Sequence, residues 1–397
     1  MQIPAIRPTR SNEFILAIDA SNIRAGGGVT HLRQLLAAAN PGESGFKRVV
    51  VLGGRSSLEN LPQRDWLQKI HVPLLDKDLS FRLFWQQLIL PRYVRRNGYD
   101  ALFCPGGTLP YRLYVPSIVL SQNLLPFEQS EASRFSPWSM MRLKLRLLRL
   151  FQSRSMSMAY GLIFLTNYAK DQVLKTVVNH TSRIAIIPHG IEKRFFLQPR
   201  IGSPISEFSF QNPFRFLYVS IVDMYKHQWH VAEAISLLRK KGLPVAIDFI
   251  GPAYPPALRR LQKTMQELDP AGEYLRYKGP VAFAELHITY QKADAFVFAS
   301  SCENLPNILL EAMAAGLPIA SSNKGPMPEI LGNAGIYFDP ESVAQIAAAL
   351  QSLFEQSELR STLAHRAYDK ARQYSWTRCA KDTFDFIADG IRAAANT

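Results

Sequence analysis

The feature that most constrains the fold of this chain is a repeated alternation of short apolar runs with longer segments of helical character. In the first half, the apolar runs end in polar residues or glycine, and they occupy residues 13–20, 46–54, 99–107, 116–123 and 161–167. Strands that alternate with helices predict a parallel, doubly wound sheet of the α/β class.

The alternation restarts beyond residues 187–214, a zone rich in proline and glycine whose composition is that of an interdomain connection. The strand-like runs of the second half are residues 214–221, 244–251, 274–279, 294–300 and 318–322. A chain of 397 residues is long enough for two domains. We therefore predict two Rossmann-like domains, residues 1–195 and 196–375, with the carboxyl ends of their strands facing a shared cleft where ligands bind.

The composition limits the cellular compartments and the classes of partner that suit this chain. Apolar residues make up 47% of the chain, yet no run approaches the roughly 18 apolar residues that span a membrane. The N-terminus lacks a cleavable signal, and the three cysteines, Cys104, Cys302 and Cys379, are widely spaced, so we expect an unprocessed cytoplasmic protein without a disulfide framework. The net charge of +14 favours partners that carry phosphate: nucleotide ligands, anionic lipid or nucleic acid.

Residues 294–316 join a buried strand, a polar loop and an apolar helix, and two glutamates lie within this unit. Glu303 lies in the loop, and Pro306 follows in what we expect to be the first helical turn, where proline is tolerated. Apolar residues surround Glu311 on the helix, so its carboxylate is predicted to be buried and to need hydrogen-bond donors. A ribose diol offers two donors, and the free N–H groups at the start of the helix suit a phosphate.

A purely structural interpretation competes with ligand binding at this unit. In that interpretation Glu311 pairs with a basic side chain and Glu303 caps the helix, which would be the preferred explanation for either glutamate alone. Two glutamates at this spacing, directly after a buried strand, favour a sugar attached to phosphates as the ligand.

Seven residues separate Glu303 from Glu311, and Ala-x-Ala-x-Gly follows Glu311. This pattern resembles the donor-site motif of the family-four (group 1) retaining glycosyltransferases of the GT-B fold. Other stretches are similar to segments of the same family: the glycine loop at 24–32, the turn at 186–196 with His189 in place of asparagine, the strand, loop and helix at 218–235, and residues 325–340. The resemblance covers most of the chain.

The resemblance implies a role for each matching residue. Glu303 would contact hydroxyls of the donor sugar, Glu311 would hold the ribose, and Lys226 would neutralise charge on the departing diphosphate, a task that a metal performs elsewhere. Further candidates are Asn304, Leu305, Pro306 and Ser220 for donor binding, and Gly27, Gly28, His31 and Asn123 for the acceptor or the phosphates. The resemblance also implies that no cofactor or metal is needed, and that the C-terminal helix, residues 376–397, packs back on the first domain.

The sequence departs from the family pattern at two positions. Ile221 stands where the family often has an arginine, so one phosphate-binding cation is missing and more of its task falls to Lys226. Asn123 occupies a position where the family often has a histidine, and an amide can hydrogen-bond but cannot shuttle a proton. The departing phosphate would then accept the proton of the acceptor.

Three other candidates carry weaker signals. Asp76, Lys77 and Asp78 form a triplet that resembles a metal-binding motif of GT-A enzymes, but we interpret it as a solvated loop. His31 either touches the acceptor or is a capping or surface residue, and the sequence does not choose between the two. His227 and His230 share a helix face without further ligands, so a metal site is not predicted there.

Residues 138–156 form an amphipathic helix whose basic residues are Arg142, Lys144, Arg146, Arg149 and Arg154. Two interpretations remain open for it: a helix packed on its own domain with a solvated basic edge, or a helix that lies on an anionic membrane surface. Elsewhere the basic residues are scattered, which argues against nucleic-acid binding.

The function predicted from these features is a retaining, metal-independent hexosyltransferase that transfers a sugar from a nucleotide diphosphate sugar to a glycan or lipid-linked glycan. We expect it to act in cell-surface polysaccharide or lipopolysaccharide biosynthesis, in the cytoplasm or peripherally on the inner face of the membrane. The alternative is a non-catalytic GT-B-like module that binds nucleotide or glycan, and the residues that differ at positions 221 and 123 motivate it.

Overall fold

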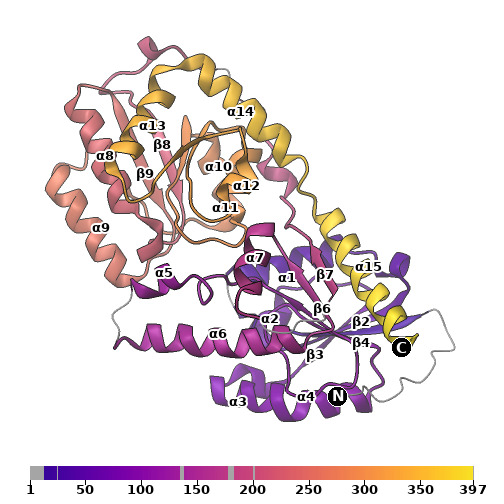
Figure 1. Cartoon of the computed structure of the whole chain (residues 1–397). Coiled ribbons are helices and arrows are strands. Elements are labelled where there is room, and N and C mark those ends of the chain that lie inside the picture. Colours follow the sequence, from indigo (N-terminus) through magenta and orange to yellow (C-terminus); the bar gives the residue numbers. More distant parts are fainter. Residues whose placement is uncertain (1–12, 25, 135–137, 178–182, 200–201, 397) are drawn as a thin grey trace. The chain divides into compact units, whose positions relative to one another are not determined.

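The computed structural model describes residues 13–24, 26–134, 138–177, 183–199 and 202–396. The chain divides into two compact units: unit 1 comprises residues 1–190 and 375–397, and unit 2 comprises residues 191–374. Each unit is built on one parallel sheet with helices on both of its faces (Figure 1). The prediction of two doubly wound, Rossmann-like domains is thereby confirmed.

Unit 1 contains a seven-stranded sheet in the order β3-β2-β1-β4-β5-β6-β7. Its strands are β1 (Phe14–Asp19), β2 (Phe46–Gly53), β3 (Leu67–His71), β4 (Ala101–Cys104), β5 (Ser117–Leu120), β6 (Gly161–Phe164) and β7 (Arg183–Ile186). Its helices are α1 (Gly27–Ala38), α2 (Arg55–Glu59), α3 (Leu79–Phe84), α4 (Leu90–Arg96), α5 (Gln129–Ser133), α6 (Met140–Met158), α7 (Asn167–Leu174) and α15 (Trp376–Ala395), with short turns η1 (Pro41–Ser44), η2 (Pro73–Asp76) and η3 (Trp85–Ile89).

Unit 2 contains a six-stranded sheet in the order β10-β9-β8-β11-β12-β13. Its strands are β8 (Phe214–Val219), β9 (Val245–Ile250), β10 (Leu275–Tyr277), β11 (Ala295–Phe298), β12 (Ile319–Ser322) and β13 (Ile336–Phe338). Its helices are α8 (Gln228–Lys240), α9 (Pro255–Leu268), α10 (Leu286–Gln291), α11 (Asn307–Ala314), α12 (Met327–Leu331), α13 (Val343–Glu355) and α14 (Ser357–Ala371), with short turns η4 (Lys193–Phe195), η5 (Ile205–Glu207), η6 (Met224–Lys226) and η7 (Phe283–Glu285).

Both sheets reverse their strand order beside their first strand. In unit 2, β8 has β9 on one side and β11 on the other, with Phe216 opposite Ala295 and Leu217 opposite Phe296. All four of these side chains are buried, so hydrophobic burial holds this register. The loops that follow β8 and β11 therefore leave the same edge of the sheet next to each other, the position where doubly wound sheets bind their ligands.

The last helix, α15, packs on α1 and η1 of unit 1, and Trp376 at its start lies against the turn that ends at Gly190. A Cβ at Gly190 would lie 2.0 Å from the backbone nitrogen of Trp376. Glycine is therefore required at position 190, where the segment that leaves unit 1 passes the start of α15, the helix that returns to it.

Gly251 positions the loop after β8. Its φ of +141° disfavours any residue with a side chain, and a Cβ there would lie 2.1 Å from the carbonyl oxygen of Ser220. Two backbone hydrogen bonds hold the same two segments together. Ser220 N–H donates to Ile250 O at 2.8 Å, and Val222 N–H donates to Pro252 O at 2.8 Å.

We expect Gly251→Ala to destabilise the protein more than Gly242→Ala does. Gly242 also has a positive φ, +83°, but a Cβ there meets no atom within 4 Å. The control should therefore cost about 1 kcal/mol of backbone strain, whereas Gly251→Ala adds a clash with backbone that cannot move freely. The midpoint of urea unfolding measures both, and equal midpoints for the two variants would contradict this account.

Candidate active site

The two loops at the reversal point of unit 2 bring together an ion pair. Lys226 ends η6 after β8, Glu303 follows β11, and Lys226 Nζ donates to Glu303 Oε1. Both side chains are well buried, at 5% and 14% exposure, so each charge depends on the other. Strand order thus brings together two predicted donor-site residues that lie 77 positions apart.

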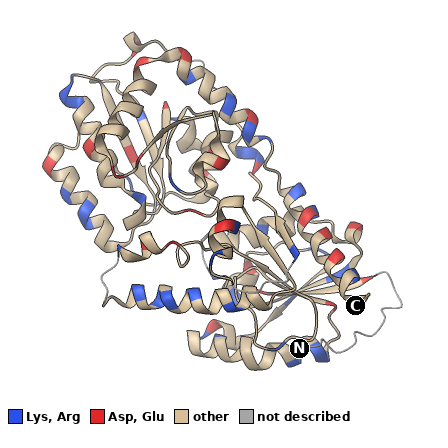
Figure 2. Cartoon of the chain, viewed as in Figure 1, with Lys and Arg blue, Asp and Glu red and all other residues tan. Residues whose placement is uncertain are grey.

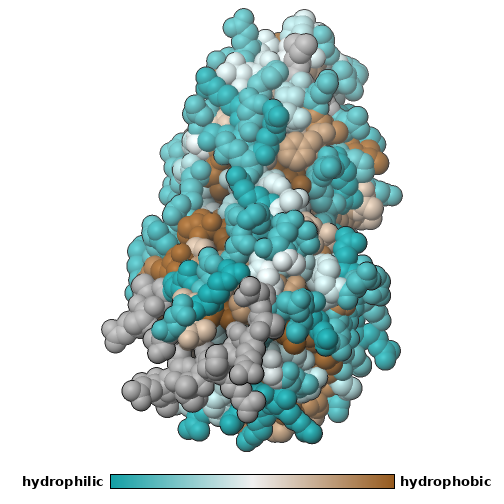
Figure 3. Space-filling view, turned by 90° about the vertical axis from the view of Figure 1, so that its right-hand side faces the viewer, coloured by the Kyte–Doolittle hydropathy of each residue, from teal (hydrophilic) through white to brown (hydrophobic). Residues whose placement is uncertain are grey.

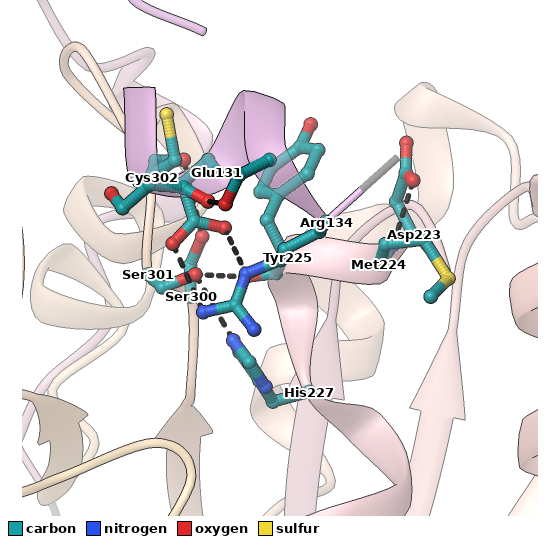
Figure 4. A network of polar contacts seen from close by, with 11 residues as sticks. Glu131, Arg134, Asp223, Met224, Tyr225, His227, Ser300, Ser301 and Cys302 are labelled. Carbon is teal, nitrogen blue, oxygen red and sulfur yellow. Dashed lines mark hydrogen bonds and ion pairs between the residues drawn. The ribbon is translucent and has the colours of Figure 1, made fainter. Parts of the chain in front are cut away.

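Hydrogen bonds between the same two loops hold this geometry (Figure 4). The Ser301 backbone N–H donates to Tyr225 O at 2.9 Å, and the Ser301 hydroxyl donates to the same oxygen at 3.2 Å. His227 Nε2 lies 3.0 Å from that hydroxyl, and because the hydroxyl hydrogen is used, the histidine donates. The loop that carries Lys226 and the loop that carries Glu303 therefore form one hydrogen-bonded block.

The backbone of His227 is unusual, and it determines where Lys226 points. Its φ is +51°, the only positive value of a non-glycine residue among the described residues. This left-handed residue stands between η6 and α8, and the Tyr218 hydroxyl donates to Lys226 O at 2.6 Å. The lysine is thereby directed over the rings of Tyr225 and Phe298, at 4.9 and 5.3 Å. Residues held in sparsely populated conformations are often found at functional sites.

Glu311 lies on α11 and is buried, as predicted, among the buried residues of that helix. Its partner is not a basic side chain, so that structural interpretation is wrong: the Tyr290 hydroxyl lies 3.0 Å from Glu311 Oε2. Burial raises the pKa of Glu311 to about 8, while the tyrosine bond and Arg194 act to lower it and Glu192 acts to raise it.

The Tyr290 hydroxyl also lies 3.2 Å from Ile308 O, and it has a single hydrogen to donate. A protonated Glu311 completes the set of bonds, because it donates to Tyr290 while Tyr290 donates to Ile308. The raised pKa of Glu311 and this geometry agree. Tyr290 was missed by sequence reasoning, since a tyrosine within a helix is ordinarily a core residue.

The start of α11 differs slightly from the prediction. Pro306 is the N-cap and not a first-turn residue: its ψ of 107° is extended, and α11 begins at Asn307. Its carbonyl accepts from the N–H groups of Leu309 and Leu310, at 3.1 and 3.2 Å. Asn304 and Leu305 precede it and are both buried.

Two further residues follow β8. Ser220 is buried, and its hydroxyl donates to Ile221 O at 3.0 Å. Ile221 itself is exposed, although it stands where the resemblance leads us to expect an arginine.

In unit 1, the glycine loop opens helix α1. Gly26 is its N-cap with a φ of +68°, Gly27 and Gly28 are its first residues, and a Cβ at Gly28 would lie 3.2 Å from Gln122 Oε1. Asn123 is exposed, and its side chain accepts from the Leu125 N–H at 3.2 Å, as in a local turn. The residue aimed at the glycine loop is thus Gln122, a neighbour that the sequence analysis did not single out.

His31 is buried within unit 1, so the structure excludes the interpretation of a capping or surface residue. Its ring packs against His189 and Trp376, with centroid separations of 4.8 and 5.7 Å. Burial lowers the pKa of His31 to about 4, and burial together with His31 holds the pKa of His189 well below its usual value. Both imidazoles are neutral at physiological pH.

The remaining candidates form no metal site in the described part of the chain, where no group of three potential ligands occurs. Asp76, Lys77 and Asp78 are exposed, and Asp76 bonds to His71 at 2.6 Å. His227 and His230 stack at 5.4 Å, but His230 Nδ1 lies 3.0 Å from Pro340 O. Figure 4 also draws Glu131 and Arg134 of unit 1, which form a bidentate pair at 2.6 and 3.1 Å.

Part of the chain is similar to a family of known proteins. Residues 204–370, nearly all of unit 2, match the family described as glycosyl transferases group 1. The O-antigen chain mannosyltransferase B of Escherichia coli is 33% identical over 112 residues, which are 28% of this chain and 29% of that protein. The chain thus spans less than a third of the length of that curated relative. Residues 204–370 are thus similar to the group 1 glycosyl transferases.

Solved structures extend the likeness to the whole chain. Sucrose-phosphate synthase from Thermosynechococcus elongatus superposes with a TM-score of 0.74 at 17% identity, covering 96% of this chain and all of that one. HepE from Anabaena, in complex with UDP and glucose, gives a TM-score of 0.68 at 16% identity over 94% and 99% of the two chains. At these identities the likeness shows the fold, which is GT-B.

The buried Glu311 should make stability fall as pH rises. Its carboxyl has a pKa of about 8 in the folded protein, against an ordinary value of 4.5, so the folded state binds more protons than the unfolded state between these limits. The contribution is fully present below about pH 4.5 and is lost through pH 8, with a slope of up to about 1.4 kcal/mol per pH unit.

Glu311→Gln, which imitates the protonated acid, should flatten this part of the dependence of unfolding free energy on pH. Denaturant unfolding at several values of pH measures it, with the exposed Glu267→Gln as control. A profile for Glu311→Gln that parallels the wild type would show that the carboxyl ionises normally.

Proposed function

We propose that the protein is a retaining, metal-independent glycosyltransferase that transfers a hexose from a nucleotide diphosphate sugar to a glycan or lipid-linked glycan. The observation that carries the proposal is the buried pair of Lys226 and Glu303 at the reversal point of the unit 2 sheet. The family of residues 204–370 and the UDP and glucose bound by HepE support a nucleotide-sugar donor.

A buried lysine beside a buried glutamate suits a ligand that is anionic at one end and hydroxylated at the other. In the proposed reaction Lys226 turns to the diphosphate and stabilises the charge that grows as the sugar departs. Glu303, released from the lysine, accepts hydrogen bonds from sugar hydroxyls. Exchange of one partner for another keeps both buried charges compensated, which limits the cost of donor binding.

The other donor contacts come from α11 and the loop before it. The N–H groups of Asn304 and Leu305, with the positive end of the helix dipole, would receive the diphosphate. Glu311 would accept from the two ribose hydroxyls. Because Asn123 cannot shuttle a proton, the departing phosphate would take the proton of the acceptor hydroxyl.

The setting we propose is the assembly of a cell-surface polysaccharide, by analogy with the E. coli relative that is named for the O-antigen chain. A lipid-linked acceptor would require the enzyme to work at the inner face of the membrane, where residues 138–156 would contact anionic lipid.

The test is cleavage of UDP-, GDP- and ADP-sugars by the purified protein, with nucleotide release as the measured quantity. We expect one donor to be cleaved, an unchanged rate in EDTA, and a loss of roughly 10²–10³ in rate for Glu303→Ala and for Lys226→Ala. Lys278→Ala, which removes a more exposed pair with Asp248 at 2.6 Å, is the matched control and should keep the wild-type rate. With an acceptor, NMR of the new glycosidic bond reads the anomeric configuration.

The exposed Ile221 favours the alternative, a binding module without turnover, because it removes one expected phosphate cation. Tight nucleotide binding with no release from any donor, unchanged in Glu303→Ala, would establish that alternative. A product of inverted configuration would refute the retaining mechanism alone.

The ribose contact makes a separate prediction about protons. Ribose hydroxyls favour an ionised Glu311, whose pKa is about 8 in the free protein, so nucleotide binding at pH 7 should release up to one proton. Affinity should therefore rise with pH up to about 8. Titration calorimetry in buffers of different ionisation enthalpy measures the release, and Glu311→Gln should abolish it; an equal release in that variant would remove Glu311 from the ribose site.

A further inference from the structure

Three leucines of helix α6 face solvent instead of packing on unit 1. The residues that the helix buries are Leu145, Gln152, Ser155 and Met156. Its exposed apolar residues are Met140, Leu143, Leu147, Leu150, Phe151 and Met158, which recur at helical spacing and form a single stripe. The helix thus packs on unit 1, as one of the two interpretations from sequence has it, but this packing leaves the apolar stripe uncovered.

Helix α3 presents a second unpartnered apolar surface. Leu79, Phe81, Leu83 and Phe84 are each between 40% and 55% exposed, and none of its residues is buried. Two thirds of the exposed large hydrophobic side chains in the described part of the chain lie between residues 79 and 158. Concentrations of this kind are uncommon on monomeric proteins and mark interaction surfaces.

The two helices belong to one region of unit 1, and residues 109–111 connect them. The Leu109 N–H donates to Ser155 of α6 at 2.9 Å, and Leu109 O accepts from Gln87 of η3, which continues α3, at 3.2 Å. Tyr111 bonds to Gln87 at 3.0 Å and lies 4.1 Å beneath the guanidinium of Arg154. We call the exposed apolar residues of α3 and α6 the α3–α6 surface.

Positive charge borders the apolar stripe of α6. Lys144 lies on one side of it, Arg146 on the other, and Arg154 within it, and all three are exposed. The helix contains five cations and no acidic residue, so it is blue without red along its length (Figure 2). The face drawn in Figure 3, by contrast, is mainly hydrophilic with separate small apolar patches.

We propose that the α3–α6 surface docks on an anionic lipid bilayer, with the apolar residues of both helices in the interfacial region and the cations of α6 at the headgroups. An exposed apolar stripe flanked by lysine and arginine is the pattern of helices that lie in a membrane interface. A surface that binds a folded protein would itself contain acidic residues and a groove. Five cations without an acidic residue instead match a uniformly anionic surface. No helix among the described residues is long and apolar enough to cross a bilayer, so this docking is peripheral.

This inference rests on the proposed function and deepens it, because it adds α3 to the membrane contact and gives the exposed apolar stripe of α6 a role in it. It also stands apart from catalysis, since lipid binding is measured without donor or acceptor. Failure of the docking and failure of the transferase activity are therefore distinguishable.

The experiment is co-sedimentation of the full chain with vesicles of phosphatidylcholine containing 30% phosphatidylglycerol, beside vesicles of phosphatidylcholine alone. We expect binding to the anionic vesicles only, weakened by salt. Lys144→Glu/Arg146→Glu should lower the partition coefficient at least tenfold, as expected for cations worth about fivefold each. Phe81→Ser/Phe84→Ser and Leu147→Ser/Leu150→Ser should each lower it at least tenfold as well.

Two controls separate the surface from general properties of the protein. Arg259→Glu/Lys263→Glu changes the net charge equally but lies on α9 in unit 2, and it should bind as the wild type. Unfolding temperatures of all variants should match, because the altered side chains are exposed. Trp138, 96% exposed beside the N-cap of α6, should shift its emission to the blue on binding.

Three results would overturn the proposal. Equal losses in the α9 control would make the binding a matter of net charge. Wild-type binding by Phe81→Ser/Phe84→Ser would exclude α3 from the contact. A lipid-free dimer that dissociates in the apolar variants, with vesicle binding unchanged, would make the surface an interface between two copies of the chain.

Discussion

The contact on which the candidate site depends is the ion pair between Lys226 and Glu303, held within a block of hydrogen bonds around Ser301. Neither charge is stable alone at that depth, because burial removes the water that would otherwise solvate it. Each loop follows a strand next to the reversal of the sheet, so the pair exists only because β8 and β11 are neighbours. A ligand that separates the two charges must compensate both.

Glu311 solves the same problem of buried charge differently. It lies on an apolar helix without a cationic hydrogen-bond partner, and it keeps its proton, which it donates to the Tyr290 hydroxyl. The site therefore contains one carboxylate held by a lysine and one carboxyl held neutral by burial. Two acids in different states can bind different parts of one ligand, a sugar and a ribose.

Burial also explains which predictions from sequence failed. The strands β3, β7 and β13 were not predicted, and they lie at sheet edges where their residues are only partly buried, so their apolar patterns are weak. Tyr290 and Gln122 were missed because nothing in their local sequence distinguishes them from core or loop residues. The sequence left open whether α6 only packs on its own domain or lies on a membrane surface, since an amphipathic pattern gives the faces of a helix but not what covers them.

The sequence by itself determined the doubly wound class, the two-domain length and the loop and helix that carry Glu303 and Glu311, because these follow from local periodicity and spacing. Tertiary structure decided which distant side chains meet: Lys226 with Glu303, Tyr290 with Glu311, and His31 with His189 and Trp376. It also decided that the apolar stripe of α6 faces solvent. The physical reason is that periodicity is a local property, whereas burial and partner choice depend on strand order and on the elements packed against each face.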